Sequence, residues 1–177
     1  VDDPGTKFEE LARLKSLNPA LKVSISVGGW TDSGKFSDVA LTDSSRRKFA
    51  ASAIDLFFTR RPGLFDGVDI DWEFPVAGGL EGNVERPADK QNFTLLLAEL
   101  RRQLDAAGAR GRRHYELTIA ASARPQEIAN VEIVRIYSLL DFINVLTYDC
   151  HAGPAPTHFH APLYAAKRHP HPHHQPC

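Results

Sequence analysis

The spacing of apolar and polar residues along the chain changes repeatedly between that of a helix and that of a β-strand. Where apolar residues recur at every third or fourth position, the pattern predicts amphipathic helices over residues 6–17, 49–58, 93–104 and 131–140. Shorter segments rich in β-branched residues predict strands over residues 21–27, 66–75, 115–121 and 141–149. The predicted order is therefore a helix followed by a strand, repeated along the chain.

This alternation favours a parallel sheet, because each helix can return the chain to the start of the next strand through a right-handed crossover. Sheets of this kind carry their chemistry at the carboxyl ends of the strands. Unusual residues stand at the ends of three predicted strands, namely Gly28 and Gly29, Asp71 and Glu73, and Tyr148 and Asp149. We therefore predict that three strand ends converge on one site.

The second predicted strand contains carboxylates where a buried strand would carry apolar residues. Because side chains alternate along a strand, Asp69, Asp71 and Glu73 are expected on one face, about 6.5 to 7 Å apart. Three neighbouring carboxylates in a partly buried site cannot all ionise cheaply, so at least one pKa is expected to be raised. A carboxyl group with a raised pKa can act as a general acid, and Glu73 lies nearest the open end of the strand.

Spacing alone leaves two other interpretations of this acidic row. It can form a solvated acidic edge, or it can bind a divalent cation such as Mg²⁺ or Ca²⁺. Nothing else in the sequence supplies an obvious ligand loop, so acid/base chemistry is favoured.

The composition narrows the class of partner. With 177 residues, of which 42% are apolar, the chain is long enough for one domain with a hydrophobic core. A net charge of -1 gives no basic surplus for nucleic acid or for an anionic membrane. No run approaches the roughly 18 apolar residues of a membrane span. We expect a neutral partner, with no nucleic acid and no membrane involved.

Three motifs occur in the chain in a recognisable order: S-x-G-G at residues 26–29, D-x-x-D-x-D-x-E at residues 66–73, and LTYD at residues 146–149. Together they resemble glycoside hydrolase family 18, the chitinases and related endo-β-N-acetylglucosaminidases. The resemblance extends over about residues 1–164.

The resemblance implies an α/β fold of the (β/α)8 TIM-barrel type, present here incompletely. A whole barrel needs about 250 residues, and the four predicted strands look like its third to sixth, so about four consecutive βα units are expected. Such a sheet would have unpaired edges and an exposed apolar inner face, which favours self-association. The domain would span residues 1–164, followed by a disordered His/Pro-rich tail at residues 165–177.

The resemblance also implies roles for the catalytic residues. Glu73 would protonate the glycosidic oxygen. Asp71 would turn between Asp69 and the substrate and hold the 2-acetamido group, whose carbonyl attacks the anomeric carbon in place of a protein nucleophile. Tyr148 would hydrogen-bond the acetamido oxygen.

Other residues are expected to bind sugar or to support the catalytic group. Asp149, Trp30 and Phe74 would lie near sugar rings, with core packing as the alternative for Trp30 and a structural role favoured for Phe74. The supporting residues would be Ser26, Gly28, Gly29 and Asp66.

By this resemblance the chain would belong to a secreted chitinase, which cleaves β-1,4 linkages between N-acetylglucosamine units of chitin or chito-oligosaccharides with retention, and without a metal or cofactor. Two alternatives stay open: a non-catalytic chitin-binding fragment, and an endo-β-N-acetylglucosaminidase acting on N-glycans. Glu73 favours the enzyme over the non-catalytic fragment, because the lectins of this family usually lack the last glutamate of the signature.

Overall fold

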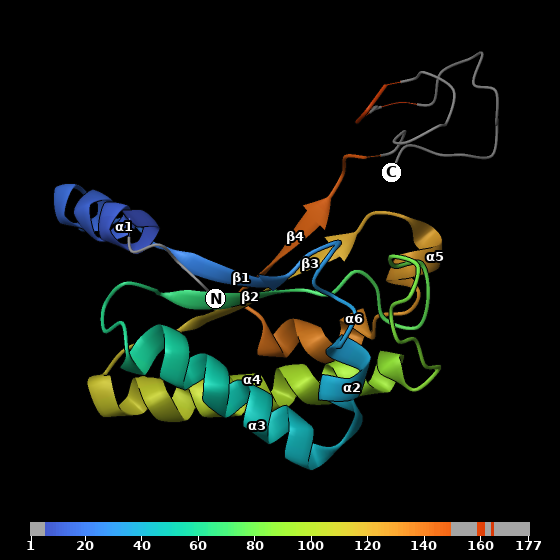
Figure 1. Ribbon diagram of the computed structural model, residues 1–177, viewed down its shortest axis with the longest axis horizontal. Coiled ribbons are helices and arrows are strands. Elements are labelled where there is room, and N and C mark those ends of the chain that lie inside the picture. The colour runs from blue at the N-terminus through green and yellow to red at the C-terminus, as the bar shows by residue number, and fades with distance from the viewer. Residues whose placement is uncertain (1–5, 150–158, 162–163, 165–177) are drawn as a thin grey trace.

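A four-stranded sheet forms the centre of the molecule (Figure 1), and the computed structural model describes residues 6–149, 159–161 and 164. The strands are β1 (Ser24–Gly28), β2 (Gly67–Asp71), β3 (Glu116–Ser122) and β4 (Phe142–Leu146). They are all parallel, in the order β1-β2-β3-β4. The predicted parallel sheet with consecutive strand order is confirmed, and its architecture is that of a partial (β/α) barrel.

The paired strands overlap the predicted segments but differ from them at their ends: β1 and β3 each extend one residue further, to Gly28 and Ser122, whereas β2 and β4 end earlier. β1 starts at Ser24, later than the predicted start at residue 21, and β2 ends at Asp71. The ends of the predicted strands 66–75 and 141–149 are therefore wrong as strand boundaries. Glu73, Tyr148 and Asp149 lie in the segments that follow the paired strands, where backbone pairing no longer holds them.

Helices precede and follow the strands as the apolar spacing predicts. They are α1 (Thr6–Leu17), α2 (Phe36–Leu41), α3 (Asp43–Ile54), α4 (Asp89–Gly111), α5 (Pro125–Ile128) and α6 (Ile133–Ile136). A π-helical turn, η1 (Asp55–Thr59), continues α3, and a 3₁₀ turn, η2 (Tyr137–Leu139), continues α6. The predicted helix over residues 131–140 is thus only α6 with η2. Sequence periodicity missed α2 and α5, because helices of six and four residues are too short to show it.

The hydrophobic core lies between the sheet and the helices α2, α3, α4 and α6, which cover one of its faces (Figure 1). Val68 and Ile70 of β2 are fully buried there, together with Leu117 and Ile119 of β3. The apolar positions of α4 belong to the same core, namely Phe93, Leu96, Leu97, Leu100 and Leu104. The apolar residues that recur with period two in the strands and with period 3.6 in the helices therefore pack against each other in one core.

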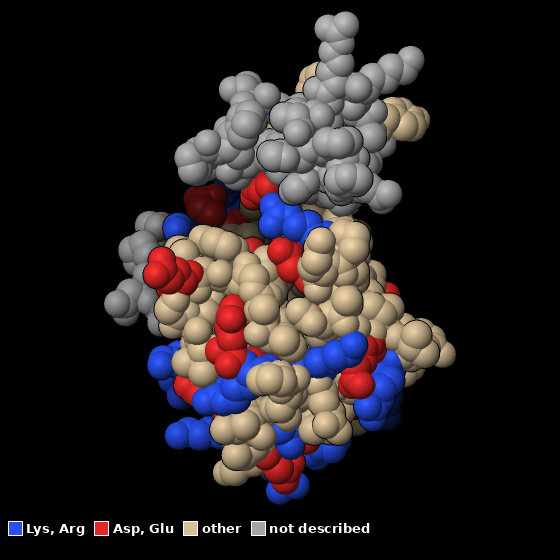
Figure 2. Space-filling view, turned by 90° about the vertical axis from the view of Figure 1, so that its right-hand side faces the viewer, with Lys and Arg blue, Asp and Glu red and all other residues tan. Residues whose placement is uncertain are grey.

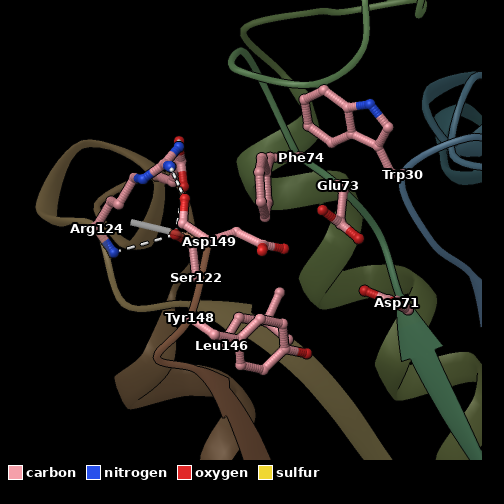
Figure 3. A pocket seen from close by; sticks show the side chains of 10 residues that line it. Trp30, Asp71, Glu73, Phe74, Ser122, Arg124, Leu146, Tyr148 and Asp149 are labelled. Carbon is pink, nitrogen blue, oxygen red and sulfur yellow. Dashed lines mark hydrogen bonds and ion pairs between the residues drawn. The ribbon is translucent and has the colours of Figure 1, made fainter. Parts of the chain in front are cut away.

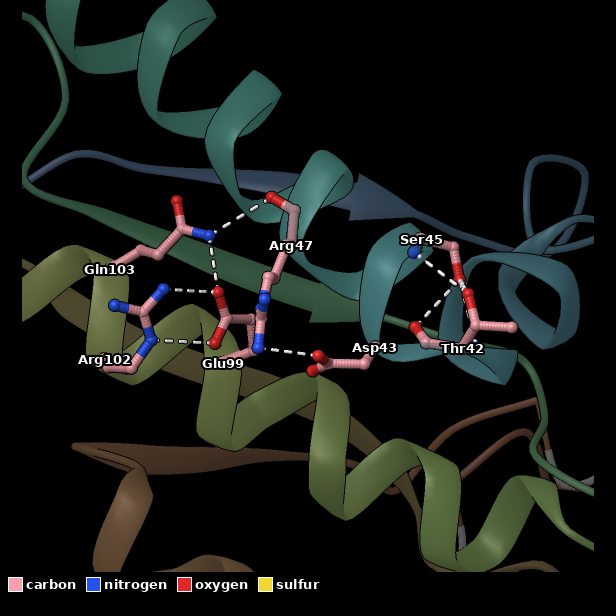
Figure 4. Close-up of polar contacts among 7 residues, drawn as sticks. All are labelled: Thr42, Asp43, Ser45, Arg47, Glu99, Arg102 and Gln103. Carbon is pink, nitrogen blue, oxygen red and sulfur yellow. Dashed lines mark hydrogen bonds and ion pairs between the residues drawn. The ribbon is translucent and has the colours of Figure 1, made fainter.

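Polar contacts within and between α3 and α4 add to the apolar packing (Figure 4). The Thr42 side chain accepts a hydrogen bond from the Ser45 amide at the start of α3, and the Ser45 hydroxyl accepts one from the Thr42 amide. On α4, Glu99 accepts hydrogen bonds from Arg102 and Gln103, which lower the pKa of its carboxyl to about 2. Gln103 also donates to a carbonyl of α3 at 3.1 Å. Of these contacts, the one from Gln103 joins α4 to α3, and the others stabilise each helix by itself.

The face of the sheet turned away from these helices carries a polar layer rather than the expected apolar one. Asp69 accepts hydrogen bonds from Ser26 at 2.8 Å, from Thr118 at 2.5 Å and from Asn144 at 3.1 Å. One carboxylate is thus bonded to all three other strands. The expectation of an apolar inner face is wrong for this layer, and an exposed apolar side chain on this face occurs at Phe142 of β4, which is 51% exposed.

Other expectations concern absences or lie outside the described part of the chain. In the part that the structure describes, no helix is long and apolar enough to cross a membrane. The same residues contain no cluster of three or more His, Cys, Asp or Glu side chains arranged to hold a metal ion. The predicted tail, residues 165–177, lies outside the described residues.

Candidate active site

A cavity of about 550 Å³ opens at the carboxyl ends of the strands. Its lining residues are Trp30, Asp71, Glu73, Phe74, Ser122, Arg124, Glu127, Leu146, Tyr148 and Asp149. Figure 3 shows Asp71, Glu73, Phe74 and Trp30 on one wall and Tyr148 with Asp149 on the wall opposite. The strand ends predicted to converge do so, and we call this cavity the strand-end pocket.

The side of the molecule toward which the strand arrows point is seen in Figure 2. Much of its centre is uncharged, whereas Lys, Arg, Asp and Glu side chains of both signs gather on its lower part, over the helices. Among the described residues on this face, basic side chains therefore lie interspersed with acidic ones.

Asp71 is the last residue of β2, and one oxygen of its carboxyl group lacks a hydrogen bond. Its Oδ1 atom is buried, and in the described part of the chain it has no hydrogen-bond partner. Burial, and then the charge of Asp69, raise the pKa of the Asp71 carboxyl. A buried acceptor without a partner is costly unless a ligand supplies a donor. Asp71 is thus suited to accept a hydrogen bond from a bound molecule.

Glu73 follows on the same wall of the strand-end pocket. Burial is the largest cause of a raised pKa at this carboxyl, followed by the negative charges of Asp71, Asp149 and Glu127. The charge of the protonated form is zero, so it avoids both penalties. Glu73 is therefore a carboxyl group that holds its proton at a higher pH than an ordinary glutamate, as a general acid requires.

Trp72, between these two acids, explains their orientation. It is 3% exposed and lies on the helix side of the sheet. Its ring stacks on Phe36 with the ring centroids 5.5 Å apart, and meets Phe93 edge to face at 5.3 Å. Because successive side chains point to opposite faces, the burial of Trp72 turns Asp71 and Glu73 toward the strand-end pocket.

The glycine that ends β1, Gly28, and the one that follows it, Gly29, permit a close approach of two strand ends. Gly28 has a φ of 117°, and a Cβ atom there would lie 2.1 Å from the carbonyl oxygen of Asp71. The Gly29 amide donates a hydrogen bond to the same oxygen at 2.8 Å. A side chain at Gly28 would therefore displace the backbone of Asp71.

Aromatic side chains line both walls of the strand-end pocket. Trp30 is 47% exposed, so its indole is not a core residue, and Phe74 lies on the same wall (Figure 3). Tyr148 is 49% exposed and stacks on the ring of His160 at a centroid distance of 6.3 Å. Exposed aromatic faces beside carboxylates suit a ligand with apolar faces and polar edges, such as a sugar.

The sequence did not point to three residues on the wall near β4. Ser122 ends β3 and donates a hydrogen bond to Glu127, which also pairs with Arg124 at 3.3 Å. Arg124 in turn donates to the Asp149 carbonyl at 3.1 Å. These contacts tie the end of β3 to the segment after β4. The rule that strand ends carry function would have found Ser122, whereas Glu127 lies on a helix too short to show a pattern.

Asp66, the first residue of the acidic motif, lies away from the strand-end pocket, just before the start of β2. It accepts hydrogen bonds from Lys15, from the Val23 amide at 2.9 Å and from Arg113 at 2.8 Å. Burial alone would raise its pKa, but the bonds from Lys15 and the Val23 amide outweigh burial and lower it. Asp66 thus joins α1 and the segment before β3 to the amino end of the sheet.

Comparison with known proteins identifies the family to which the chain belongs. The model for glycosyl hydrolases family 18 matches residues 2–175, and the chain belongs to this family. Chitinase A1 of Niallia circulans is 55% identical over 142 residues, which cover 80% of this chain and 20% of that protein.

Solved structures of chitinases are also similar to this chain. The catalytic domain of psychrophilic chitinase B from Arthrobacter TAD20 is 39% identical with a TM-score of 0.87, over 95% of this chain and 43% of that one. A mutant of Ostrinia furnacalis Group II chitinase catalytic domain 2 in complex with (NAG)5 is 31% identical with a TM-score of 0.76, over 96% of this chain and 43% of that one. The chain therefore spans less than half the length of each of these relatives.

Proposed function

We propose that the chain carries the catalytic group of a chitinase, which cleaves β-1,4 linkages between N-acetylglucosamine units with retention of configuration. The observation that carries this proposal is that three carboxyl groups, on β2 and just after it, have different hydrogen-bonding and electrostatic surroundings. Asp69 has three hydrogen-bond donors, Asp71 has a buried oxygen with none in the described residues, and Glu73 has a raised pKa. An anchor, an acceptor and an acid thus follow one another toward the strand-end pocket.

Each of these residues has a part in the proposed reaction. Glu73 donates its proton to the glycosidic oxygen as the bond to the anomeric carbon breaks. The Asp71 carboxylate accepts a hydrogen bond from the acetamido N–H, which makes the acetamido carbonyl oxygen a better nucleophile. That oxygen bonds to the anomeric carbon and forms a cyclic oxazolinium ion, so no protein nucleophile is needed.

The second half of the reaction restores the enzyme. Glu73, now a carboxylate, removes a proton from water while the water oxygen attacks the anomeric carbon from the face that the leaving group occupied. The ring opens, the acetamido group is regenerated and the configuration is retained. Tyr148 is proposed to hydrogen-bond the acetamido oxygen, and Asp149 to contact the same sugar.

The proposed ligand is chitin or a chito-oligosaccharide. Support comes from the exposed face of Trp30 in the strand-end pocket and from the relative whose structure holds (NAG)5. Phe74 is proposed to add apolar surface beside it. Because a polymer such as chitin cannot enter a cell intact, we propose that the protein acts outside the cell.

The test is a comparison of substrates with the purified chain. Chito-oligosaccharides are expected to be cleaved, whereas cello-oligosaccharides and fully deacetylated chitosan oligomers are expected to resist, since neither has the acetamido carbonyl. The control is Glu73→Gln, which removes the acid. Equal rates on acetylated and deacetylated oligomers would exclude the mechanism, and binding without cleavage would favour a non-catalytic sugar-binding chain.

A further inference from the structure

The position of Glu73 depends on side chains from two loops. β2 ends at Asp71, so no neighbouring strand pairs with the backbone of Glu73. Its amide instead donates a hydrogen bond to the Ser33 hydroxyl at 2.9 Å, and its carbonyl accepts one from the Asn83 side chain at 3.2 Å. Both polar groups of this backbone unit are thus held by residues outside the three family motifs.

Ser33 lies in the loop after β1 and is 1% exposed. Besides accepting from the Glu73 amide, its hydroxyl lies 2.8 Å from the Gly29 carbonyl and 3.1 Å from the Asp71 carbonyl, either of which can accept its proton. One buried hydroxyl therefore connects the loop after β1 to the backbone on both sides of Trp72. A buried polar group with all its hydrogen bonds made fixes local geometry.

Asn83 lies in the loop between β2 and α4 and contacts the carbonyl of Glu73. Its contact is close, because Gly79 leaves the space for it: a Cβ atom at Gly79 would lie 2.4 Å from the Glu73 carbonyl oxygen and 2.7 Å from the Asn83 amide nitrogen. The amide of the next residue, Val84, donates to the Gly34 carbonyl at 3.3 Å. The two loops are thereby joined beside Ser33.

Further along, polar contacts join α2 to Arg86 and to the start of α4. Asp89 is fully buried and accepts a hydrogen bond from Ser37 at 2.6 Å. Arg86 donates to Ser37 at 2.7 Å and to Asp38 at 2.7 Å. The loop that carries Asn83 is therefore held against α2 through Arg86.

We propose that Ser33 and Asn83 are positioning residues, which hold the backbone of Glu73 so that its carboxyl group reaches the glycosidic oxygen. This inference rests on the proposed function of Glu73 as the acid. Neither residue touches the substrate in this scheme. Their effect is exerted through the Glu73 amide and carbonyl, and removal of either contact lets the carboxyl group move relative to the scissile bond.

The first test compares substrates that differ in their need for an acid. Ser33→Ala is expected to lower kcat for unactivated chitotetraose by about 10 to 100-fold, the cost of misplacing a catalytic group. It is expected to lower kcat much less for an aryl chitobioside, whose phenolate leaves without protonation. Asn83→Ala should show the same selectivity with a smaller effect.

The matched control is Ser37→Ala, which removes a hydroxyl that is equally buried but bonds Asp89 and Arg86 instead of Glu73. It is expected to lower the melting temperature while keeping the ratio of the two kcat values. If Ser33→Ala also leaves that ratio unchanged, its role is structural and the proposal is wrong.

The second test does not depend on activity. The pKa of the Glu73 carboxyl, measured by NMR titration of carboxyl-labelled chain, is expected to fall toward its ordinary value of 4.5 in Ser33→Ala, because the released group becomes more solvated. An unchanged pKa would contradict the positioning role. A wild-type chain without chitinase activity would contradict the proposed function, and this titration would still decide whether Ser33 positions Glu73.

Discussion

Carboxyl groups lie at both ends of strand β2, but they differ in hydrogen bonding and in the direction of their pKa shifts. At the amino end, Asp66 receives hydrogen bonds from Lys15, from Arg113 and from a backbone amide, and its pKa is lowered. At the carboxyl end, Asp71 has a buried oxygen without a partner in the described residues, and the pKa values of Asp71 and Glu73 are both raised.

The difference shows that residue type alone does not decide what a carboxylate does. The fold supplies donors to Asp66 and withholds them from Asp71, so one group stabilises the folded state and the other keeps its hydrogen-bonding capacity for a ligand. A buried polar group without a hydrogen-bond partner is unfavourable for folding, and such exceptions are expected at sites that bind a ligand. The contrast can be tested by changing one end of the strand at a time.

The largest expected effect is on catalysis. Glu73→Gln and Asp71→Asn should each lower kcat on chito-oligosaccharides by about 10² to 10⁴-fold, because one removes the acid and the other the acceptor for the acetamido N–H. Circular dichroism should show an unchanged fold. Asp66→Asn is the matched control at the other end of the strand and should retain its kcat per folded molecule. Wild-type turnover in Glu73→Gln would show that another group is the acid.

An intermediate effect is expected on stability at the amino end. Asp66→Asn should lower the free energy of unfolding by about 1 to 3 kcal/mol, the usual cost of losing charged hydrogen bonds at a buried site. Urea unfolding at pH 7 measures this difference.

The pH dependence of that effect follows from the lowered pKa of Asp66. Its contribution is present above the ordinary value of 3.8 and is lost as the pH falls through the lower pKa of the folded state. The gap between wild type and Asp66→Asn should therefore close in acid. A gap that stays constant down to pH 2 would mean that the charge of Asp66 contributes nothing.

The smallest expected effect has the opposite sign. The pKa of Glu73 is raised, so its ionisation costs stability as the pH rises from its ordinary value of 4.5 through the folded-state value. Glu73→Gln should then be more stable than wild type at neutral pH, by about 1 to 3 °C in Tm, and equal to it near pH 4. Calorimetry at both pH values checks this. A lower Tm for the variant at neutral pH would contradict the assigned cause.

The sequence alone predicted much of this arrangement, because successive side chains of a strand must point to opposite faces of the sheet. Asp69, Asp71 and Glu73 were expected on one face for this reason. What the sequence did not reveal is which carboxylates are satisfied, since the donors Thr118 and Asn144 are ordinary polar residues in distant strands. Contacts of this kind depend on how strands align, which no local pattern encodes.

Loop contacts escaped prediction for a related reason. Ser33 and Asn83 lie in segments without periodicity, and their importance appears only where two loops meet at Glu73. The polar inner face was also unexpected, because barrel interiors are usually filled with branched apolar residues. Here, one buried carboxylate that needs donors accounts for Ser26, Thr118 and Asn144 together.

The polar layer around Asp69 has a consequence for how the sheet assembles. A slip of one residue in the alignment of β1, β3 or β4 against its neighbours would turn a donor to the helix side and place an apolar side chain against the carboxylate. Each such slip would leave Asp69 short of a hydrogen bond in a buried place. Asp69 therefore selects a single strand register during folding, which apolar side chains of similar size would discriminate less sharply.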